Sequence, residues 1–162
     1  MDDLTQLSGR VGASLKGRGE TVAVAESSTG GLISASLLAI PGASAFLLGG
    51  GVIYTMAARR ALLPDAGDAL DGVRSASEPY ALWLARTMRA HLGSSWGLAE
   101  TGAAGPTGNR YGDPPGHSCM AVVGPVERVL TLETGRAERQ ANMWAFAESA
   151  FLLFEKALDE CA

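Results

Sequence analysis

The feature that most restricts the fold is a long uncharged stretch: no residue from Ser27 to Ala58 is Asp, Glu, Lys, Arg or His. Stretches of this kind are typical of chain packed inside a protein or a membrane. A membrane-spanning helix needs about 20 continuous apolar residues. Pro41 and Gly42 interrupt this stretch, and the glycines 49–51 interrupt it again. We therefore expect short elements packed in a globular domain, and no membrane partner.

Apolar spacing predicts helices and strands that alternate along the chain. Helices are expected over about 3–17, 32–39, 56–63, 77–93 and 136–159, and strands over 21–25, 49–54, 95–102, 117–124 and 128–134, the last two as an antiparallel pair. This order predicts an α/β fold, a three-layer α/β/α sandwich with a mixed β-sheet, as a single domain over residues 1–162. Ligands of such folds bind beyond the carboxyl ends of strands, which directs attention to loops 26–31, 42–50 and 101–110.

Composition narrows the class of ligand and the compartment. The 162 residues suit one domain, and a net charge of −4 gives no large basic surface, so we expect no nucleic-acid partner. Small anions remain possible ligands through local arginines. Cys119 and Cys161 have neither a disulfide-framework nor a metal-site spacing, and the acidic amino terminus is not a secretory signal. A cytoplasmic location is expected.

Two glycine-rich turns follow strands. "AESSTGGL" leads from a strand into a helix, so its exposed N–H groups and helix dipole can cradle an anion, although simple capping by Ser27, Ser28 or Thr29 explains it equally. It lacks the lysine of a P-loop. "TGAAGPTG" taken alone is a plain loop, and Ser44 has no nucleophile-elbow motif around it, so a Ser-His-Asp triad has little support.

Several motifs in order resemble one family. "AESSTGGLISASLLAIPGASAFLLGGGVIY", then "SEP" and "TGAAGPTG", are similar to the CinA carboxy-terminal-domain family, which includes the PncC-type nicotinamide-nucleotide amidases. The similarity covers nearly the whole chain. It implies a single α/β/α domain that hydrolyses the carboxamide of nicotinamide mononucleotide to nicotinate mononucleotide and ammonia, without a metal or organic cofactor. It leaves open whether the chain forms a homo-oligomer.

The resemblance also implies site residues. The catalytic set is Ser44, in the position of the family's serine nucleophile, with Tyr54, Thr101 and Arg59, which stands where the amidases have their catalytic lysine. Ser28 replaces a family cysteine. The substrate-binding positions implied are Glu26, Ser27, Thr29, Gly30, Gly31, Gly50, Gly102, Gly105 and Arg139, with Arg136 as the alternative to the last.

Arginine at position 59 changes the expected mechanism. A lysine accepts a proton from serine only when its amine is neutral, which costs about 4.6 kcal/mol at pH 7, whereas neutralising an arginine costs roughly 9 kcal/mol. We therefore expect Arg59 to stay charged. Three interpretations remain open. In the first, another group accepts the proton from serine, and the candidates are Glu26, Glu100 and His117. In the second, the site binds a nucleotide or small anion without hydrolysing it, and in the third, the domain is an interaction module with an unused pocket.

Two further departures from the family pattern bear on these interpretations. Glu100 replaces a usually apolar residue, and strand alternation should direct it away from the face of Thr101. The loop "GNRYGDPPGH" departs from the family's G-G-x-x-x-K-P-V-G, and His117, at its end, replaces a small hydroxyl residue. The altered loop favours an altered ligand.

Overall fold

A computed structural model describes residues 2–162 of the chain, and the side chains from Leu4 onward. In chain order its elements are α1 (Asp2–Arg18), β1 (Val22–Glu26), α2 (Leu32–Leu38), the short 3₁₀ helix η1 (Ala43–Ala45), β2 (Leu47–Val52), α3 (Met56–Leu62), α4 (Glu78–Leu92), β3 (Trp96–Ala103), β4 (His117–Val123), β5 (Glu127–Glu133) and α5 (Arg139–Glu160).

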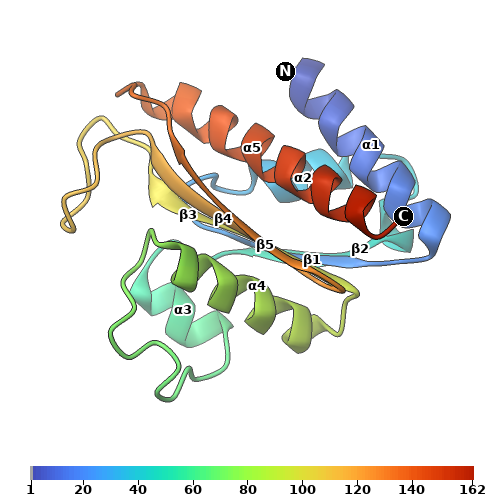
Figure 1. The fold of residues 1–162 in the computed structure, drawn as a ribbon, viewed down its shortest axis with the longest axis horizontal. Helices are drawn as coiled ribbons and strands as arrows, with labels where there is room; N and C mark the ends of the chain where they lie inside the picture. Colours follow the sequence, from blue (N-terminus) through green and yellow to red (C-terminus); the bar gives the residue numbers. More distant parts are fainter. Residues whose placement is uncertain (1) are drawn as a thin grey trace.

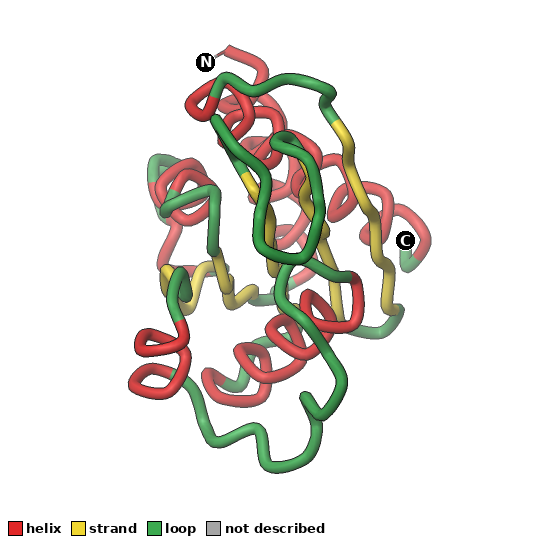
Figure 2. Tube along the Cα trace, turned by 90° about the vertical axis from the view of Figure 1, so that its left-hand side faces the viewer, coloured by secondary structure: helices red, strands yellow, loops and turns green. Residues whose placement is uncertain are grey.

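The elements form three layers, as the sequence predicts. The five strands have the order β2-β1-β3-β4-β5, in which β2, β1 and β3 are parallel and β4 and β5 are antiparallel to their neighbours. Helices α1, α2 and α5 cover one face of the sheet, and α3 and α4 lie on the other (Figure 1). Figure 2 shows helices on both sides of the strands. The mixed α/β/α sandwich is therefore confirmed.

Alternation along the strands separates two hydrophobic cores. Val22, Val24 and Leu98 pack toward α1, α2 and α5, whereas Ala23 and Ala99 pack toward α4. Small residues allow α4 to approach closely: a Cβ added to Gly97 would lie 2.1 Å from the carbonyl oxygen of Ala85. Burial of apolar surface on both faces is the main source of stability in such a sheet. No helix in the described part of the chain is long and apolar enough to cross a membrane.

One expectation about the loops is wrong. Loop 42–50 was expected beyond the carboxyl end of a strand, but β2 begins at Leu47, two residues earlier than predicted, and runs parallel to β1. Residues 42–46 therefore lie at the amino ends of the strands, and Tyr54 lies just beyond the carboxyl end of β2. The start of the strand was placed too late because the glycines 49–51 carry no apolar side chains, so the alternation of apolar residues that indicates a strand is absent there.

Candidate functional site

A buried glutamate caps α2. The carboxylate of Glu26 accepts hydrogen bonds from the N–H groups of Gly31 (3.2 Å), Ile33 (2.8 Å) and Ser34 (2.9 Å) and from the hydroxyl of Thr29 (2.8 Å). These are the groups that a helix start leaves without partners. The expected anion cradle is therefore filled by the chain's own carboxylate, and capping by Ser27, Ser28 or Thr29 is wrong as well.

Glu100 joins the same cluster from β3. Its Oε2 accepts from the N–H groups of Ser27 (3.2 Å) and Thr29 (2.9 Å), and its Oε1 contacts the hydroxyls of Ser28 and, at 2.9 Å, Ser118. Burial raises the pKa of Glu100 above its ordinary value, and the hydrogen bonds from Ser28, Thr29 and Ser118 partly oppose this. We call Glu26, Ser28, Thr29, Glu100 and Ser118 the carboxyl cluster.

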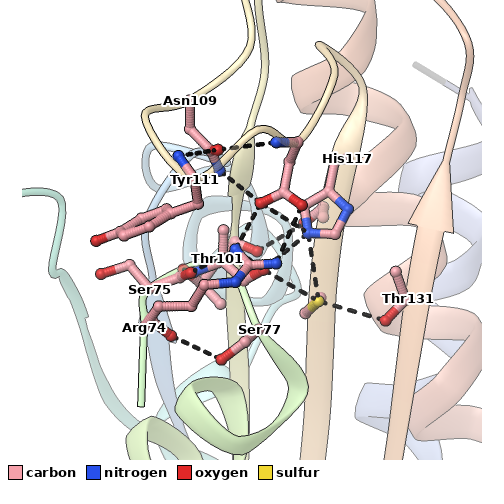
Figure 3. A network of polar contacts seen from close by, with 12 residues as sticks. Arg74, Ser75, Ser77, Thr101, Asn109, Tyr111, His117 and Thr131 are labelled. Atoms are coloured by element: carbon pink, nitrogen blue, oxygen red, sulfur yellow. Dashed lines mark hydrogen bonds and ion pairs between the residues drawn. The ribbon is translucent and has the colours of Figure 1, made fainter. Parts of the chain in front are cut away.

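A second network lies on the α4 face. The hydroxyl of Thr101 accepts from the N–H of Ala76 (3.1 Å), and the carbonyl of Ala76 accepts from Nε2 of His117 (2.7 Å). Ala76 has φ +54°, a conformation that costs a non-glycine residue about 1 kcal/mol or more. The hydrogen bonds from its N–H to Thr101 and from His117 to its carbonyl hold this residue in that conformation (Figure 3).

His117 is held at both ring nitrogens. Nδ1 lies 2.5 Å from Oε1 of Glu133, and Nε2 faces the Ala76 carbonyl, so both nitrogens meet acceptors. Burial opposes protonation, but the hydrogen bonds to Glu133 and Ala76 outweigh it and raise the pKa of His117. A ring that donates from both nitrogens is the imidazolium ion.

An arginine ties this network to the loop 109–113. Arg74 makes a bidentate ion pair with Asp113 (2.6 and 3.0 Å), and Asp113 also accepts from the Asn109 amide (2.8 Å). Burial works to raise the pKa of Asp113, but the hydrogen bonds from Arg74 and Asn109 hold it below its ordinary value. The Arg74 guanidinium lies 5.3 Å from the ring centroid of Tyr111. We call Arg74, Asp113, His117 and Glu133 the arginine-histidine network.

The network supports one wall of a cavity at the carboxyl ends of β1, β2 and β3. The cavity has a volume of about 300 Å³, within the range of ligand sites. Its walls combine hydroxyl groups, three tyrosines and one arginine, and its lining includes Ser27, Tyr54, Thr55, Met56, Ser75, Tyr80, Thr101, Gly102, Asn109, Arg110 and Tyr111. Four residues expected at the site therefore meet here: Ser27, Tyr54, Thr101 and Gly102.

Tyr54 links this cavity to the start of α5. Its hydroxyl accepts a hydrogen bond from Arg139 (2.9 Å), which also donates to the carbonyl of Gly105 (2.5 Å). A Cβ added to Gly30 would lie 3.3 Å from the side chain of Met143, also on α5. Arg139, and not the alternative Arg136, therefore reaches Tyr54.

Two proposed catalytic residues lie apart from the cavity within the described chain. Ser44 is exposed on η1, at the amino end of β2, and is not among the lining residues. Arg59 is on α3, with its guanidinium 6.0 Å from the ring centroid of Tyr80 and 5.9 Å from that of Trp83. Since Tyr80 lines the cavity, Arg59 is one side chain away from it. Gly50 lies in β2, where a Cβ would meet the Ser34 hydroxyl at 2.2 Å.

The three alternative bases are all engaged elsewhere. Glu26, Glu100 and His117 do not contribute to the cavity lining in the described structure, and each has the hydrogen-bond partners given above. Glu100 does point away from the Thr101 face, as strand alternation predicts. Within residues 2–162, no group of three or more His, Cys, Asp or Glu side chains is arranged to hold a metal ion.

Sequence reasoning missed Ser75, Ala76, Tyr80 and Tyr111 as cavity residues, and it included Asn109 and Arg110 only through the loop 101–110 as a whole. Only two signals pointed to them. One is "SEP" at 77–79, just after the strained Ala76, and the other is the divergent loop "GNRYGDPPGH". Neither signal shows that Arg74 and Asp113, far apart in sequence, are paired.

The fold and site define an α/β/α domain with a polar, tyrosine-lined cavity at the strand ends, and comparison with known proteins gives its family. Residues 4–158 match the family described as the CinA C-terminal domain. A CinA-like protein of Anaeromyxobacter sp. (strain K) is 41% identical over 145 residues, 86% of this chain and 35% of that protein. A putative competence-damage inducible protein of Desulforamulus reducens is 46% identical over 115 residues, 71% of this chain and 28% of that protein.

The chain therefore belongs to the CinA C-terminal domain family. It spans 25% to 35% of the length of the curated relatives that it matches. Among solved structures, the competence/damage inducible protein CihA from Agrobacterium tumefaciens is similar with a TM-score of 0.86 and 29% identity, over 97% of this chain and 96% of that one.

Proposed function

We propose that the chain binds nicotinamide mononucleotide in the cavity and hydrolyses its carboxamide to nicotinate mononucleotide and ammonia. The observation that carries the proposal is the convergence of Ser27, Tyr54 and Thr101 on one cavity. These residues come from three separate segments, and the resemblance to the nicotinamide-nucleotide amidases implies a site role for each. Membership of the CinA C-terminal domain family supports the same proposal.

The cavity chemistry suits a mononucleotide. Tyr80 and Tyr111 offer aromatic faces for a flat ring, and hydroxyls of Ser27, Ser75 and Thr101 suit ribose and carboxamide groups. Arg110 at the cavity and Arg139 beside Tyr54 are the cations available for a phosphate. The α2 N-terminus is not available, because Glu26 already accepts its N–H groups.

The proposed chemistry takes Ser44 as the nucleophile, the role that the resemblance to the amidases implies. It therefore requires Ser44, which lies outside the cavity lining of the described chain, to meet the substrate in the active protein. The hydroxyl oxygen of Ser44 adds to the carboxamide carbon, the C–N bond breaks, and the hydroxyl proton leaves with the nitrogen as ammonia. Water then hydrolyses the ester, giving the carboxylic acid and free serine. Arg59, with its charge, serves to stabilise negative charge and not to accept the proton.

Ammonia release from nicotinamide mononucleotide tests the proposal. We expect measurable turnover by the wild type, its loss in Ser44→Ala, and a higher rate in Arg59→Lys, because lysine can lose its proton at a much lower cost. Ala45→Ser, which adds a hydroxyl one residue away, is the matched control and should keep the rate. Activity that persists in Ser44→Ala would exclude the serine mechanism.

Nucleotide binding without hydrolysis is the second candidate function. It is favoured by Arg59 at the position of the family's lysine and by the engagement of Glu26, Glu100 and His117 in other contacts. Calorimetry with nicotinamide mononucleotide separates the two. Micromolar binding with no ammonia from the wild type, and turnover restored in Arg59→Lys, would establish binding and exclude the enzyme.

A further inference from the structure

The proposed reaction needs a group that takes the proton of the attacking hydroxyl. Arg59 cannot do so, because an arginine keeps its proton at neutral pH. Glu26, Glu100 and His117 do not line the cavity in the described chain, and each already has hydrogen-bond partners. A general base has to come within hydrogen-bond reach of the proton that it takes. The base must therefore be sought among the residues of the cavity wall.

The titratable side chains of that wall, among the described residues, are Arg110 and three tyrosines, Tyr54, Tyr80 and Tyr111. A tyrosine has an ordinary pKa of about 10, close to ~10.4 for lysine and more than three units below ~13.8 for arginine. It therefore loses its proton about as readily as the lysine of the related amidases. The ionised tyrosine is an anion, so a neighbouring cation favours it, whereas the same cation would also favour a neutral lysine.

Tyr111 has such a cation against its hydroxyl. The guanidinium of Arg110 donates to the hydroxyl oxygen of Tyr111 at 2.9 Å and lies 5.0 Å from the ring centroid. This hydrogen bond lowers the pKa of Tyr111 below its ordinary value, while burial opposes the change and a hydrogen bond with Ser75 adds to it. Arg74 also lies near the ring, but its charge is balanced by Asp113. Arg110 is therefore the group that favours the phenolate.

The loop that carries Tyr111 is fixed by side-chain contacts. The amide oxygen of Asn109 accepts from the N–H groups of Tyr111 (3.0 Å) and Asp113 (3.1 Å). The ion pair between Arg74 and Asp113 ties the loop to the segment that carries Ser75. Figure 3 shows the ring of Tyr111 and the side chain of Ser75 projecting to the same side, and both residues line the cavity. The phenol is thus presented to the cavity from a loop held in one conformation.

We propose that Tyr111, with its hydroxyl held by Arg110, is the general base and general acid of the amidase reaction. Its phenolate oxygen takes the proton of the nucleophile as the serine oxygen bonds to the carboxamide carbon. When the C–N bond breaks, the tyrosine returns this proton to the nitrogen, which leaves as ammonia. Water then gives a proton to the phenolate as its oxygen attacks the ester, and the tyrosine passes that proton to the serine oxygen. The role rests on the proposed function, including the meeting of nucleophile and substrate in the cavity.

Two departures from the family pattern then have one explanation. Position 59 has an arginine instead of the amidase lysine, and the loop "GNRYGDPPGH" supplies a phenol and a guanidinium to the cavity. Arg59 can no longer act as the base, but its permanent charge, like that of Arg110, favours an anionic group nearby. A tyrosine base is therefore compatible with arginine at position 59.

Titration of Tyr111 tests the effect of the cation without using activity. In protein with isotope-labelled tyrosine rings, NMR follows the three tyrosines separately, and Tyr111→Phe assigns the resonance of Tyr111. We expect a midpoint below about pH 10 that rises in Arg110→Gln. Arg128→Gln removes an arginine that pairs with Glu160 and is not among the residues lining the cavity of the described chain, so it should leave the midpoint unchanged. A wild-type midpoint at or above about 10 overturns the inference.

The pH dependence of ammonia release tests the base itself. Tyr111→Phe keeps the aromatic ring and loses the hydroxyl, so kcat should fall about 100-fold or more, while KM should change less than about threefold. Fluorination of the Tyr111 ring lowers the pKa of the phenol, so the acidic limb of the kcat profile should move to lower pH by as much as the NMR midpoint does. Arg110→Gln should move the limb to higher pH. A tyrosine that only held the loop in place would not move it.

The outcomes separate this role from the proposed function. No ammonia from the wild type at any pH excludes the amidase and with it a catalytic Tyr111. Ammonia release that needs Ser44 but keeps its rate and pH dependence in Tyr111→Phe overturns the inference and leaves the amidase proposal standing. An acidic limb that follows fluorination of Tyr54 and not of Tyr111 assigns the base to Tyr54 and also overturns it. A limb that follows fluorination of Tyr111 supports the inference.

Discussion

The carboxyl cluster and the arginine-histidine network lie on opposite faces of the sheet and differ in the contacts that build them. On the α2 face, two carboxyl groups accept hydrogen bonds from nearby backbone and hydroxyl groups. On the α4 face, four charged side chains from distant segments form ion pairs and hydrogen bonds with each other. In the carboxyl cluster, Glu26 receives N–H groups from five to eight residues further along the chain. In the arginine-histidine network, Arg74 reaches Asp113 and His117 reaches Glu133. Each cluster contacts a residue that lines the cavity. Glu100 of the carboxyl cluster accepts from the N–H of Ser27, and His117 of the arginine-histidine network donates to the carbonyl of Ala76.

The difference in contacts indicates that the two clusters have different roles, one in the stability of the fold and the other in the shape of the cavity. The carboxyl cluster fixes a helix start, so it sets the position of Ser27 relative to the sheet whatever the loops do. The arginine-histidine network holds residues 74–77 and 109–113, which are loops that line the cavity. Loss of the first should therefore unfold the domain, and loss of the second should mainly loosen the ligand site.

The largest expected effect is that of Glu26→Ala. It leaves three N–H groups of α2 without their acceptor in a buried setting, which should lower the free energy of unfolding by about 3–5 kcal/mol. Chemical denaturation measures this. The control is Glu138→Ala, at the exposed start of α5, where the side chain makes no capping bond, and the change should be below about 0.5 kcal/mol. Equal losses in the two variants would contradict the capping role.

Arg74→Met tests the other cluster at a smaller cost. It leaves the partly buried Asp113 without its ion pair, so we expect a loss of about 1–3 kcal/mol and weaker nucleotide binding in calorimetry. Arg10→Met is the matched control. Its bidentate pair with Glu155 is more exposed and joins α1 to α5, so stability should change by less than about 1 kcal/mol and binding not at all. Unchanged binding in Arg74→Met would contradict the role of the network.

These clusters also mark how far the sequence predicts the structure. Strands and helices followed from apolar periodicity, and the turn after β1 was found from its glycines and hydroxyls. The capping residue was missed because helix starts are usually capped by Ser, Thr, Asp or Asn just before the helix, or by a glutamate within its first turn. Glu26 instead ends a buried strand and reaches forward to the N–H of Ser34. Residues close in sequence are predictable only when they make their usual contacts.

Contacts between segments that are distant in the chain could not be predicted from the sequence. Nothing in the spacing of Arg74 and Asp113, 39 residues apart, indicates their pairing. Ser28 and Glu100 were each noted as departures from the family, but their contact was not predicted. In the structure the hydroxyl of Ser28 donates a hydrogen bond to the carboxyl group of Glu100, so the two departures from the family pattern are in direct contact. A single sequence shows each change but not that they meet.

Glu100 should give the carboxyl cluster a pH dependence. Its pKa is raised in the folded state, so the native protein binds the extra proton, and its contribution to stability is complete below about pH 4.5 and is lost as pH rises through the folded pKa. The stability of the wild type relative to Glu100→Gln should therefore fall with rising pH, measured by denaturation from pH 4 to 9. Glu127→Gln should show the opposite sign, because Arg86 lowers the pKa of Glu127.

His117 should act in a higher pH window than Glu100, and we place its effect last of the four. Its raised pKa means that the stability from its contacts with Glu133 and Ala76 is complete below about pH 6.5 and is lost as pH rises through the folded pKa. The stability difference between the wild type and His117→Gln should shrink as the pH rises from 6 to 9. A difference that stays constant with pH would mean that folding leaves the pKa of His117 unchanged, and a difference that grows with rising pH would mean that the ring is held neutral, so either result would contradict the charged ring.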